Sequence, residues 1–252
     1  MAKGQPCTDS ISPVTTSLIQ SATRLNGATP AFWGRYFTSV NTGGGVEYRH
    51  AAENRALGAA GVRLLPIARQ TASVAGNLQQ GIDDGVANAK DFITTFDASF
   101  LSSQGQRFYM FLDVEGSPSL SSDYFTGWAR GLAEESASWS SQLSSGSVEI
   151  LPCVYAPQDD AATWAALATA LAAGVQCMGV WIARYFSGIC EMGEWSDVIV
   201  TPVSPDPFPW PILAWQYAGN CLNGVIDCSQ TNPNIDPQTQ LLDFLVLPSA
   251  NG

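Results

Sequence analysis

The stretch Phe108-Tyr109-Met110-Phe111-Leu112-Asp113-Val114-Glu115 combines an uninterrupted apolar run with two carboxylates at its end. A strand that is apolar on both faces is typical of a parallel sheet that is covered on each side. Because alternate residues of a strand point to the same side, Asp113 and Glu115 share one face and Val114 takes the other. The stretch therefore predicts a buried parallel strand that carries two carboxylates to one edge of its sheet.

Similar apolar runs are spread along the chain, and stretches with helical spacing lie between them. Repeated strand–helix units of this kind, about eight in all, predict a (β/α)8 TIM barrel that spans residues 1–252 as a single domain. An open doubly wound sheet is the alternative, but no Gly-x-Gly-x-x-Gly motif follows the first strand. The predicted strands are 5–9, 33–37, 62–68, 108–114, 149–155, 178–185, 212–217 and 224–228, and the predicted helices are 14–25, 46–60, 78–96, 122–138, 160–173 and 237–244.

Charge and hydropathy exclude two classes of partner. The chain has 22 Asp and Glu residues against 11 Lys and Arg, a net charge of −11, whereas nucleic-acid binding needs basic patches. No apolar run reaches the roughly 18 residues of a membrane-spanning helix, so no membrane partner is expected. The first residues lack the apolar core of a signal peptide. We expect a monomer that is cytoplasmic, leaves by a signal-independent route, or is a trimmed secreted protein.

The six cysteines and the single histidine argue against a metal centre. No Cys-x-x-Cys motif is present, and one histidine, His50, cannot complete a usual zinc site. The spacings Cys221 to Cys228 and Cys177 to Cys190 would each allow a small disulfide loop, and six buried thiols are the alternative. We therefore predict no metal and no cofactor.

Two further acidic residues fall at predicted strand ends. Asp227 ends the last predicted strand, and Asp9 lies at the end of the first. In a barrel the carboxyl ends of the strands surround one mouth, which is where barrel enzymes hold their active sites. Asp113 and Glu115 are therefore predicted to meet Asp227 and Asp9 there, although Asp227 fits a loop-capping role equally well.

Paired carboxylates are suited to cleaving glycosidic bonds. The Cβ atoms of Asp113 and Glu115 should lie roughly 6–7 Å apart, twice the rise per strand residue. Neighbouring carboxylates raise each other's proton affinity, so one can stay protonated as a general acid. The spacing does not decide between retention and inversion at the sugar. The competing interpretation is that one carboxylate caps the next helix and the other binds an arginine.

Aromatic and planar polar side chains also follow the predicted strands. Such groups bind sugars by stacking and by hydrogen bonds, although each aromatic residue taken alone is more typical of a core. A ring of them around one mouth favours a saccharide ligand. The candidate substrate-binding residues, besides Asp9, are Arg35, Tyr36, Tyr155, Arg184, Tyr185, Trp215, Gln216 and Tyr217, with Arg69 and Gln70 after the third strand.

The order of these motifs resembles glycoside hydrolase family 25, the lysozyme-type muramidases. It is still more similar to the related glycoside-hydrolase-like barrels known as a domain of unknown function. The resemblance covers roughly residues 30–232. The matching pieces are Phe32–Phe37 (FWGRYF), Ala60–Ile67 (AGVRLLPI), Gly81–Gly85 (GIDDG), Phe111–Glu115 (FLDVE), Trp181–Tyr185 (WIARY), Ala214–Tyr217 (AWQY) and Val225–Asp227 (VID).

The resemblance implies a role for each carboxylate. Glu115 matches the family's proton donor, and Asp113 matches the residue that assists it by activating water or by orienting the substrate's N-acetyl group. Asp227 matches the acidic residue of the last strand. The family usually begins with Gly-x-Asp, whereas this chain reads Gly4-Gln5-Pro6-Cys7-Thr8-Asp9. Whether Asp9 takes the first-strand position is therefore left open.

The function that the resemblance implies is hydrolysis of the glycan strand of bacterial peptidoglycan, with this polysaccharide as the partner. A barrel that binds glycan without turning it over is the alternative, motivated by the departure at the first strand. An enzyme of small metabolites ranks last, because the segment 219–224 is not a phosphate-binding loop. A Ser–His–Asp triad is disfavoured, since no Gly-x-Ser-x-Gly motif is present and His50 falls in a predicted helix.

Overall fold

The computed structural model describes residues 2–37, 48, 50–69, 73–116, 118–185, 189–195 and 200–250, except for the side chains of 50 and 51. Within this part of the chain, the strands form one closed barrel in which each strand pairs with the next and the last pairs with the first. The strands are β1 (Pro6–Asp9), β2 (Phe32–Phe37), β3 (Arg63–Ala68), β4 (Arg107–Asp113), β5 (Glu149–Pro157), β6 (Val180–Ala183), β7 (Ile212–Asn220) and β8 (Ile226–Thr231).

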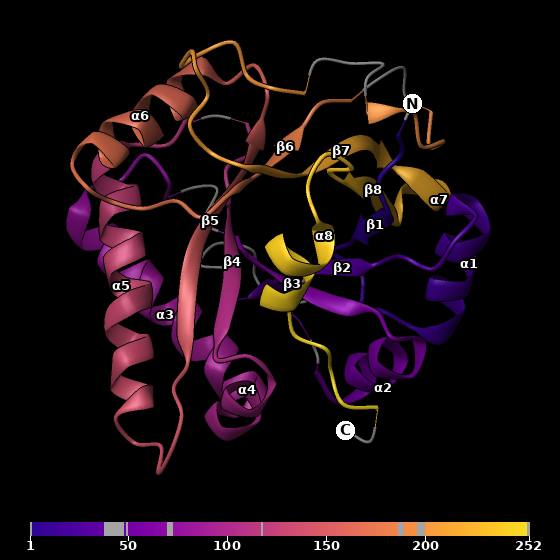
Figure 1. The fold of residues 1–252 in the computed structure, drawn as a ribbon, viewed down its shortest axis with the longest axis horizontal. Helices are drawn as coiled ribbons and strands as arrows, with labels where there is room; N and C mark the ends of the chain where they lie inside the picture. Colours follow the sequence, from indigo (N-terminus) through magenta and orange to yellow (C-terminus); the bar gives the residue numbers. More distant parts are fainter. Residues whose placement is uncertain are drawn as a thin grey trace.

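Helices lie around the outside of this barrel (Figure 1). They are α1 (Thr16–Asn26), α2 (His50–Ala60), α3 (Leu78–Phe96), α4 (Ala98–Gln104), α5 (Ser122–Ser140), α6 (Ala161–Ala172), α7 (Cys221–Gly224) and α8 (Pro237–Gln240), followed by the 3-10 turn η2 (Leu242–Phe244). The predicted α/β barrel with eight strands is thereby confirmed. Among the described residues, no helix combines the length and apolarity that crossing a membrane requires.

The longer helices begin where short polar residues cap them. The side chains of Thr15, Asn77, Ser121 and Asp160 each accept a hydrogen bond from a backbone N–H in the first turn of the helix that follows. Such caps satisfy donors that have no partner inside the helix. These local signals explain why the predicted starts of these four helices lie close to the observed ones. The predicted start of the helix 46–60 lies outside the described residues.

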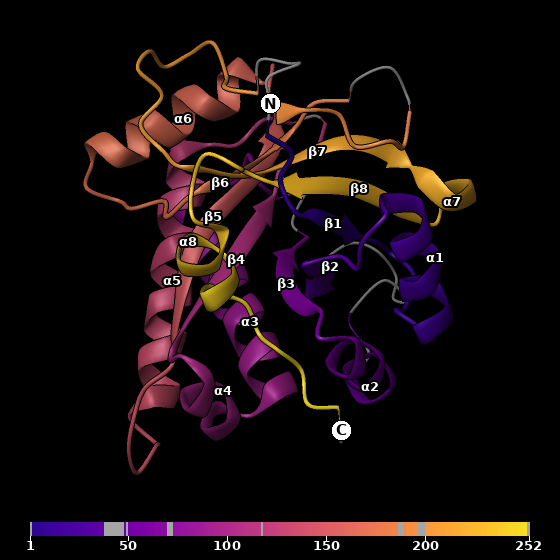
Figure 2. The same cartoon turned by 45° about the vertical axis from the view of Figure 1, so that its right-hand side comes forward.

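One strand runs against the predicted direction. β8 pairs antiparallel with both β7 and β1, whereas the apolar runs predict parallel strands throughout. The link between β7 and β8 is the four-residue α7, in which Leu222 and Asn223 have positive φ angles. Parallel neighbours need a crossover of about a dozen residues or more, so this link reverses the chain as a hairpin does (Figure 2).

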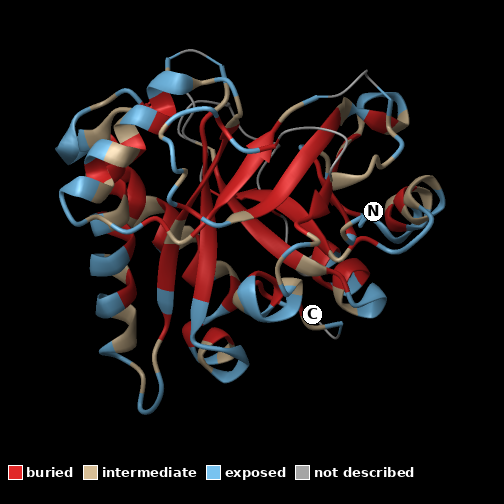
Figure 3. Cartoon of the chain, turned by 45° about the horizontal axis from the view of Figure 1, so that its top comes forward, coloured by how far each residue is buried: buried red, intermediate tan, exposed pale blue. Residues whose placement is uncertain are grey.

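Strand side chains alternate between two packed regions. Inward-facing residues such as Phe111 and Trp181 fill the barrel, and outward-facing residues such as Leu112 and Val154 pack beneath the helices. The strands are buried along almost their whole length (Figure 3). This burial on both faces is the physical reason why the strands read as continuous apolar runs.

Helices α3 and α5 approach each other more closely than side chains would allow. A Cβ atom on Gly81 would lie 2.2 Å from the carbonyl oxygen of Tyr124, and one on Gly127 would lie 2.0 Å from that of Leu78. Glycine is therefore required at both crossing points. The pair lies on the outside of the barrel, beside β4 and β5 (Figure 1).

The chain's last segment closes the end of the barrel at which the parallel strands begin. Leu241, Leu242 and Leu245 join the inward-facing core, and the ring of Phe244 stacks on Tyr109 with centroids 4.3 Å apart. This end is therefore plugged by apolar side chains. Polar side chains gather at the opposite end, which is the mouth where the parallel strands end.

A disulfide joins Cys190, in the segment after β6, to Cys221 at the start of α7. The pairings suggested by spacing are therefore wrong, because Cys177 and Cys228 are buried free thiols. Cys7 and Cys153 are also free and buried. The bond ties a segment near the mouth to the reversal between β7 and β8.

Candidate active site

Four carboxylates meet at the mouth of the barrel. Asp113 is the last residue of β4, and Glu115 follows it on the same side. Asp9 is the last residue of β1 and lies directly opposite Asp227 of β8 in the strand register. Because β8 is antiparallel, Asp227 reaches the mouth from near the start of its strand and not, as predicted, from its end.

The carboxylate of Asp113 is buried without a hydrogen-bond partner. Its side chain is only 1% exposed, and neither oxygen has a partner among the described residues. Burial raises the pKa of Asp113 well above its usual range, and the charge of Glu115 raises it further, against the opposing attraction of Arg69. An acid in this position favours its neutral form until a positive charge or a donor arrives.

Asp9 and Asp227 form a second acidic pair beside the first. Burial and then the charge of Asp227 are the main causes that raise the pKa of Asp9 well above its usual range. Burial also raises the pKa of Asp227, while a hydrogen bond from the backbone N–H of Asn220, 2.6 Å long, lowers it. Asp9 therefore lies at the mouth, at the end of the first strand, a placement that the sequence alone did not decide.

Gly34 makes room for Asp9. A Cβ atom on this residue of β2 would lie 2.7 Å from the Cβ of Asp9 and 2.9 Å from Cδ1 of Ile67. Any side chain would displace one of them. Gly34 was not predicted as a site residue, although a glycine inside an apolar strand indicates a close approach of another chain segment.

Gln216 of β7 connects the acidic pair to Glu115. Its Nε2 donates to Asp9 Oδ1 at 3.1 Å and to Asp227 Oδ2 at 3.5 Å. Its Oε1 accepts hydrogen bonds from the hydroxyls of Tyr155 and, at 3.1 Å, Tyr185. The Tyr155 hydroxyl also lies 2.7 Å from Glu115 Oε1.

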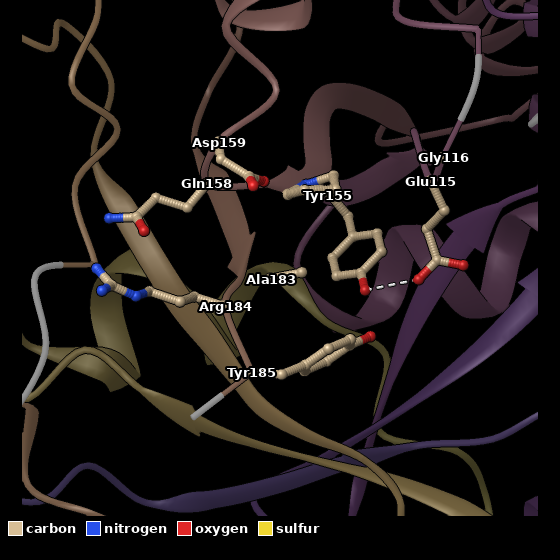
Figure 4. A pocket seen from close by; sticks show the side chains of 9 residues that line it. Glu115, Gly116, Tyr155, Gln158, Asp159, Ala183, Arg184 and Tyr185 are labelled. Carbon is tan, nitrogen blue, oxygen red and sulfur yellow. Dashed lines mark hydrogen bonds between the residues drawn. The ribbon is translucent and has the colours of Figure 1, made fainter. Parts of the chain in front are cut away.

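An open cavity of about 660 Å³ begins at Glu115 (Figure 4). Glu115 is partly buried, and Tyr185 beside it is 55% exposed. Gln158, Asp159 and Arg184 line the far part of the cavity. Gln158 and Asp159 follow the observed end of β5 at Pro157, whereas the strand was predicted to end at Tyr155, which is why they were not predicted as site residues.

Tyr36 and Arg69 lie on the β2 and β3 side of the same mouth. The guanidinium carbon of Arg69 is 5.2 Å from the centre of the Tyr36 ring, a cation–π contact. Burial raises the pKa of the Tyr36 hydroxyl, and the charge of Asp113 adds to this effect. Gln70, predicted beside them, and the side chain of His50 lie outside the described residues.

Arg35 does not lie at the mouth, contrary to expectation. It points away from the barrel interior and forms a two-bond ion pair with Glu53 of α2, with contacts of 2.7 and 3.1 Å. Both side chains are 0% exposed. Arg35 also donates to the carbonyl oxygen of Ser10 at 2.8 Å, so it supports the backbone that follows Asp9.

Trp215 and Tyr217 do not lie at the mouth either, contrary to the prediction. Both belong to the core between the barrel and the helices. They flank the inward-facing Gln216 and must point the other way. The indole of Trp215 donates to the carbonyl oxygen of Arg184 at 2.8 Å and packs edge-on against Trp195. Trp215 therefore supports the backbone that carries Arg184 and Tyr185.

The described part of the chain contains no group of three or more His, Cys, Asp or Glu residues arranged to hold a metal ion. The mouth is thus an acidic cluster held by an amide and two tyrosines. Such a cluster can hold and release protons next to an open cavity.

Fold and mouth together define an α/β barrel with a carboxylate-lined site. No family model and no curated protein matches the sequence. Solved structures match the fold, and the resemblance to muramidase barrels is confirmed at that level.

Three of these structures illustrate the match. An uncharacterized protein of B. stearothermophilus has a TM-score of 0.66 and 22% identity, covering 96% of this chain and 100% of that one. The Tat-secreted protein Rv2525c of Mycobacterium tuberculosis has a TM-score of 0.54 and 13% identity, with coverages of 93% and 96%. The muramidase from Acremonium alcalophilum has a TM-score of 0.52 and 17% identity, with coverages of 95% and 99%.

Proposed function

We propose that the protein is a glycoside hydrolase of the N-acetylmuramidase type, which cleaves the glycan strand of bacterial peptidoglycan. The observation that carries the proposal is the meeting of Asp113 and Glu115 with Asp9 and Asp227 at one end of an open cavity. The barrel shared with a muramidase supports it.

Glu115 is the proton donor in this proposal. It lines the cavity, and its Oε1 is held by the hydroxyl of Tyr155. A glycosidic oxygen placed in the cavity would receive the proton from Glu115 as the bond to the sugar breaks. Positive charge then develops on the sugar ring, as in other glycosidases.

Asp113 responds to that developing charge. As an anion it is unfavourable in the free protein, because it is buried without a donor and lies near Glu115. When a substrate binds, Asp113 can release its proton to water, because the N–H of an N-acetyl group and the positive charge that develops on the sugar both stabilise the anion. Stabilisation that appears only in the transition state raises the rate and not merely the affinity.

The cavity lining favours peptidoglycan over a neutral glycan. Tyr185 offers an exposed ring on which a sugar can stack. Arg184 offers a cation within the same cavity. The carboxylates of muramic acid and of its peptide stem are suitable partners for a guanidinium, and a neutral chitin-type chain lacks them.

The test compares the wild type with Glu115→Gln on purified cell walls, by loss of turbidity and by release of reducing ends. We expect a loss of roughly 100- to 10,000-fold, the usual contribution of general acid catalysis. Glu149→Gln is the matched control, because Glu149 is 52% exposed and begins β5 at the opposite end of the barrel.

Equal activity of wild type and Glu115→Gln would contradict the assignment of the proton donor. Binding of wall glycan by a wild type that releases no reducing ends would instead support a glycan-binding barrel without turnover.

A further inference from the structure

The orientation of the Gln216 amide follows from the acids on one side of it. Its nitrogen faces the carboxylates of Asp9 and Asp227. The N–H of Asn220 donates to Asp227 at 2.6 Å, which favours the ionised form of that carboxylate. Because the Nε2 of Gln216 is engaged by these two carboxylates, its Oε1 is left to accept hydrogen bonds from the two tyrosines.

The hydroxyl of Tyr155 has one hydrogen to donate but two oxygen neighbours within hydrogen-bond distance. A phenol carries one hydrogen, yet this hydroxyl lies within hydrogen-bond distance of Gln216 Oε1 and of Glu115 Oε1. If the hydrogen points to Gln216, the contact with Glu115 is favourable only when Glu115 supplies a hydrogen of its own. If it points to Glu115, that group accepts it best as a carboxylate.

We propose that Gln216 is a positioning residue that receives the Tyr155 hydroxyl hydrogen while Glu115 holds the catalytic proton. This inference rests on the proposed function. When Glu115 gives its proton to the glycosidic oxygen, the Tyr155 hydroxyl turns and donates to the new carboxylate. Tyr155 itself neither gains nor loses a proton, and the hydroxyl turns back when Glu115 is protonated again.

The surroundings of Tyr155 fit this role. Its side chain is buried, and burial together with the charge of Glu115 raises the pKa of its hydroxyl. The phenol therefore keeps its hydrogen. Its ring is held against Trp181 with centroids 4.5 Å apart, which leaves rotation of the O–H bond as the free movement.

Other charged or titratable groups lie around the mouth and its cavity and must be kept constant in a test. Among the described residues around the mouth and its cavity, they are Asp9, Tyr36, Arg69, Asp113, Asp159, Arg184, Tyr185 and Asp227. Gln216 contacts two of these acids directly, so a single substitution at Gln216 changes their hydrogen bonds as well. A double-mutant cycle separates the two effects.

The experiment measures the pH at which the Glu115 carboxyl is half ionised, by carbon NMR of protein labelled in glutamate side chains. Glu115→Gln identifies the signal. In Gln216→Met we expect this pH to fall by about half to one unit, the equivalent of one lost neutral hydrogen bond. On a Tyr155→Phe background, Gln216→Met should cause no further shift.

A Gln216→Met shift that persists without the Tyr155 hydroxyl would overturn the proposal, since the effect would then come from Asp9 and Asp227. No shift in either background would also overturn it. Tyr185→Phe gives a second test with a milder change, because it removes a competing donor from Gln216 Oε1. It should move the half-ionisation pH upward, and a downward shift or none would count against the mechanism.

The proposed function is tested separately by the reducing-end assay. If the wild type cleaves wall glycan, the basic limb of its pH–rate profile should move with the NMR shift in Gln216→Met. If the wild type releases no reducing ends, the proposed function fails, while the NMR cycle still decides whether Gln216 receives the Tyr155 hydrogen.

Discussion

Buried charges occur on both faces of the barrel wall, and the two sets are organised in opposite ways. On the outer face, Arg35 and Glu53 neutralise each other through two short contacts, and Glu53 also accepts from the backbone N–H of Val14 at 2.8 Å. On the inner face, Asp113 and Asp9 share one sign of charge with their neighbours, and Asp113 has no donor among the described residues.

The outer ion pair stabilises the barrel, whereas the acids at the mouth are suited to a chemical function. A buried ion pair with matched hydrogen bonds has little to gain from a ligand. Buried acids of like sign store unfavourable energy, which a proton or a positively charged transition state can release. Strained or unsatisfied groups of this kind are typical of functional sites.

The largest effect on stability is expected from breaking the outer pair. Arg35→Met leaves Glu53 buried without its cation and should lower the free energy of unfolding by about 3–5 kcal/mol. Arg107→Met is the matched control, because the Arg107–Glu149 pair is about half exposed and should be worth less than about 1 kcal/mol. Urea denaturation measures both variants.

The double replacement Arg35→Met with Glu53→Met sharpens the same point. It removes both charges and should recover much of the lost stability. A double variant as unstable as Arg35→Met alone would mean that the contacts of Arg35 with Ser10 matter more than the ion pair.

Asp113→Asn should raise the free energy of unfolding, by less than Arg35→Met lowers it. Because the pKa of Asp113 is raised in the folded protein, folding binds a proton more tightly, and stability falls as the pH rises above the unfolded value near 4. The neutral amide avoids this loss, so the variant should gain on the order of 1–3 kcal/mol at pH 7.

The gain from Asp113→Asn should disappear at pH 3, where the wild-type carboxyl is protonated in both states. Thermal unfolding across this pH range gives the measurement, and cell-wall cleavage should fall in the same variant. A variant that is less stable than the wild type at pH 7 would mean that the Asp113 anion has favourable contacts in the folded protein.

The smallest effect is expected at the rim. Arg184→Gln should reduce cleavage of peptidoglycan by about 5- to 10-fold, the value of roughly one charge-assisted hydrogen bond to a carboxylate. Cleavage of a neutral chitin-type oligosaccharide, if detectable, should change less. Equal losses on both substrates would show that Arg184 does not recognise an anionic group.

Much of the fold could be predicted from the sequence because the strands are buried on both sides. Each predicted strand overlaps an observed one, since continuous apolar runs reflect that burial. The direction of β8 could not be read from the run itself, because an apolar strand looks the same in either direction. The signal lay in the short link after β7, which is too brief for a crossover.

Strand parity explains which predicted mouth residues were placed correctly. Asp113 and Glu115 share a face, as the alternation requires. The same rule excludes Arg35 from the face of Tyr36, and Trp215 and Tyr217 from that of Gln216. The Cys190–Cys221 bond could not be deduced, because spacing alone does not fix connectivity.

Because β1 pairs with β8, the mouth can form only after the last strand has been synthesised. Asp9 meets Asp227 across this seam, and the hydrogen bond from Gln216 to Asp9 spans 207 residues. A chain emerging from the ribosome carries Asp9, Asp113 and Glu115 long before the strands that supply Gln216 and Asp227. A chain that ends before Asp227 therefore lacks part of the acidic cluster, and any activity that the cluster confers begins only when β8 closes the barrel.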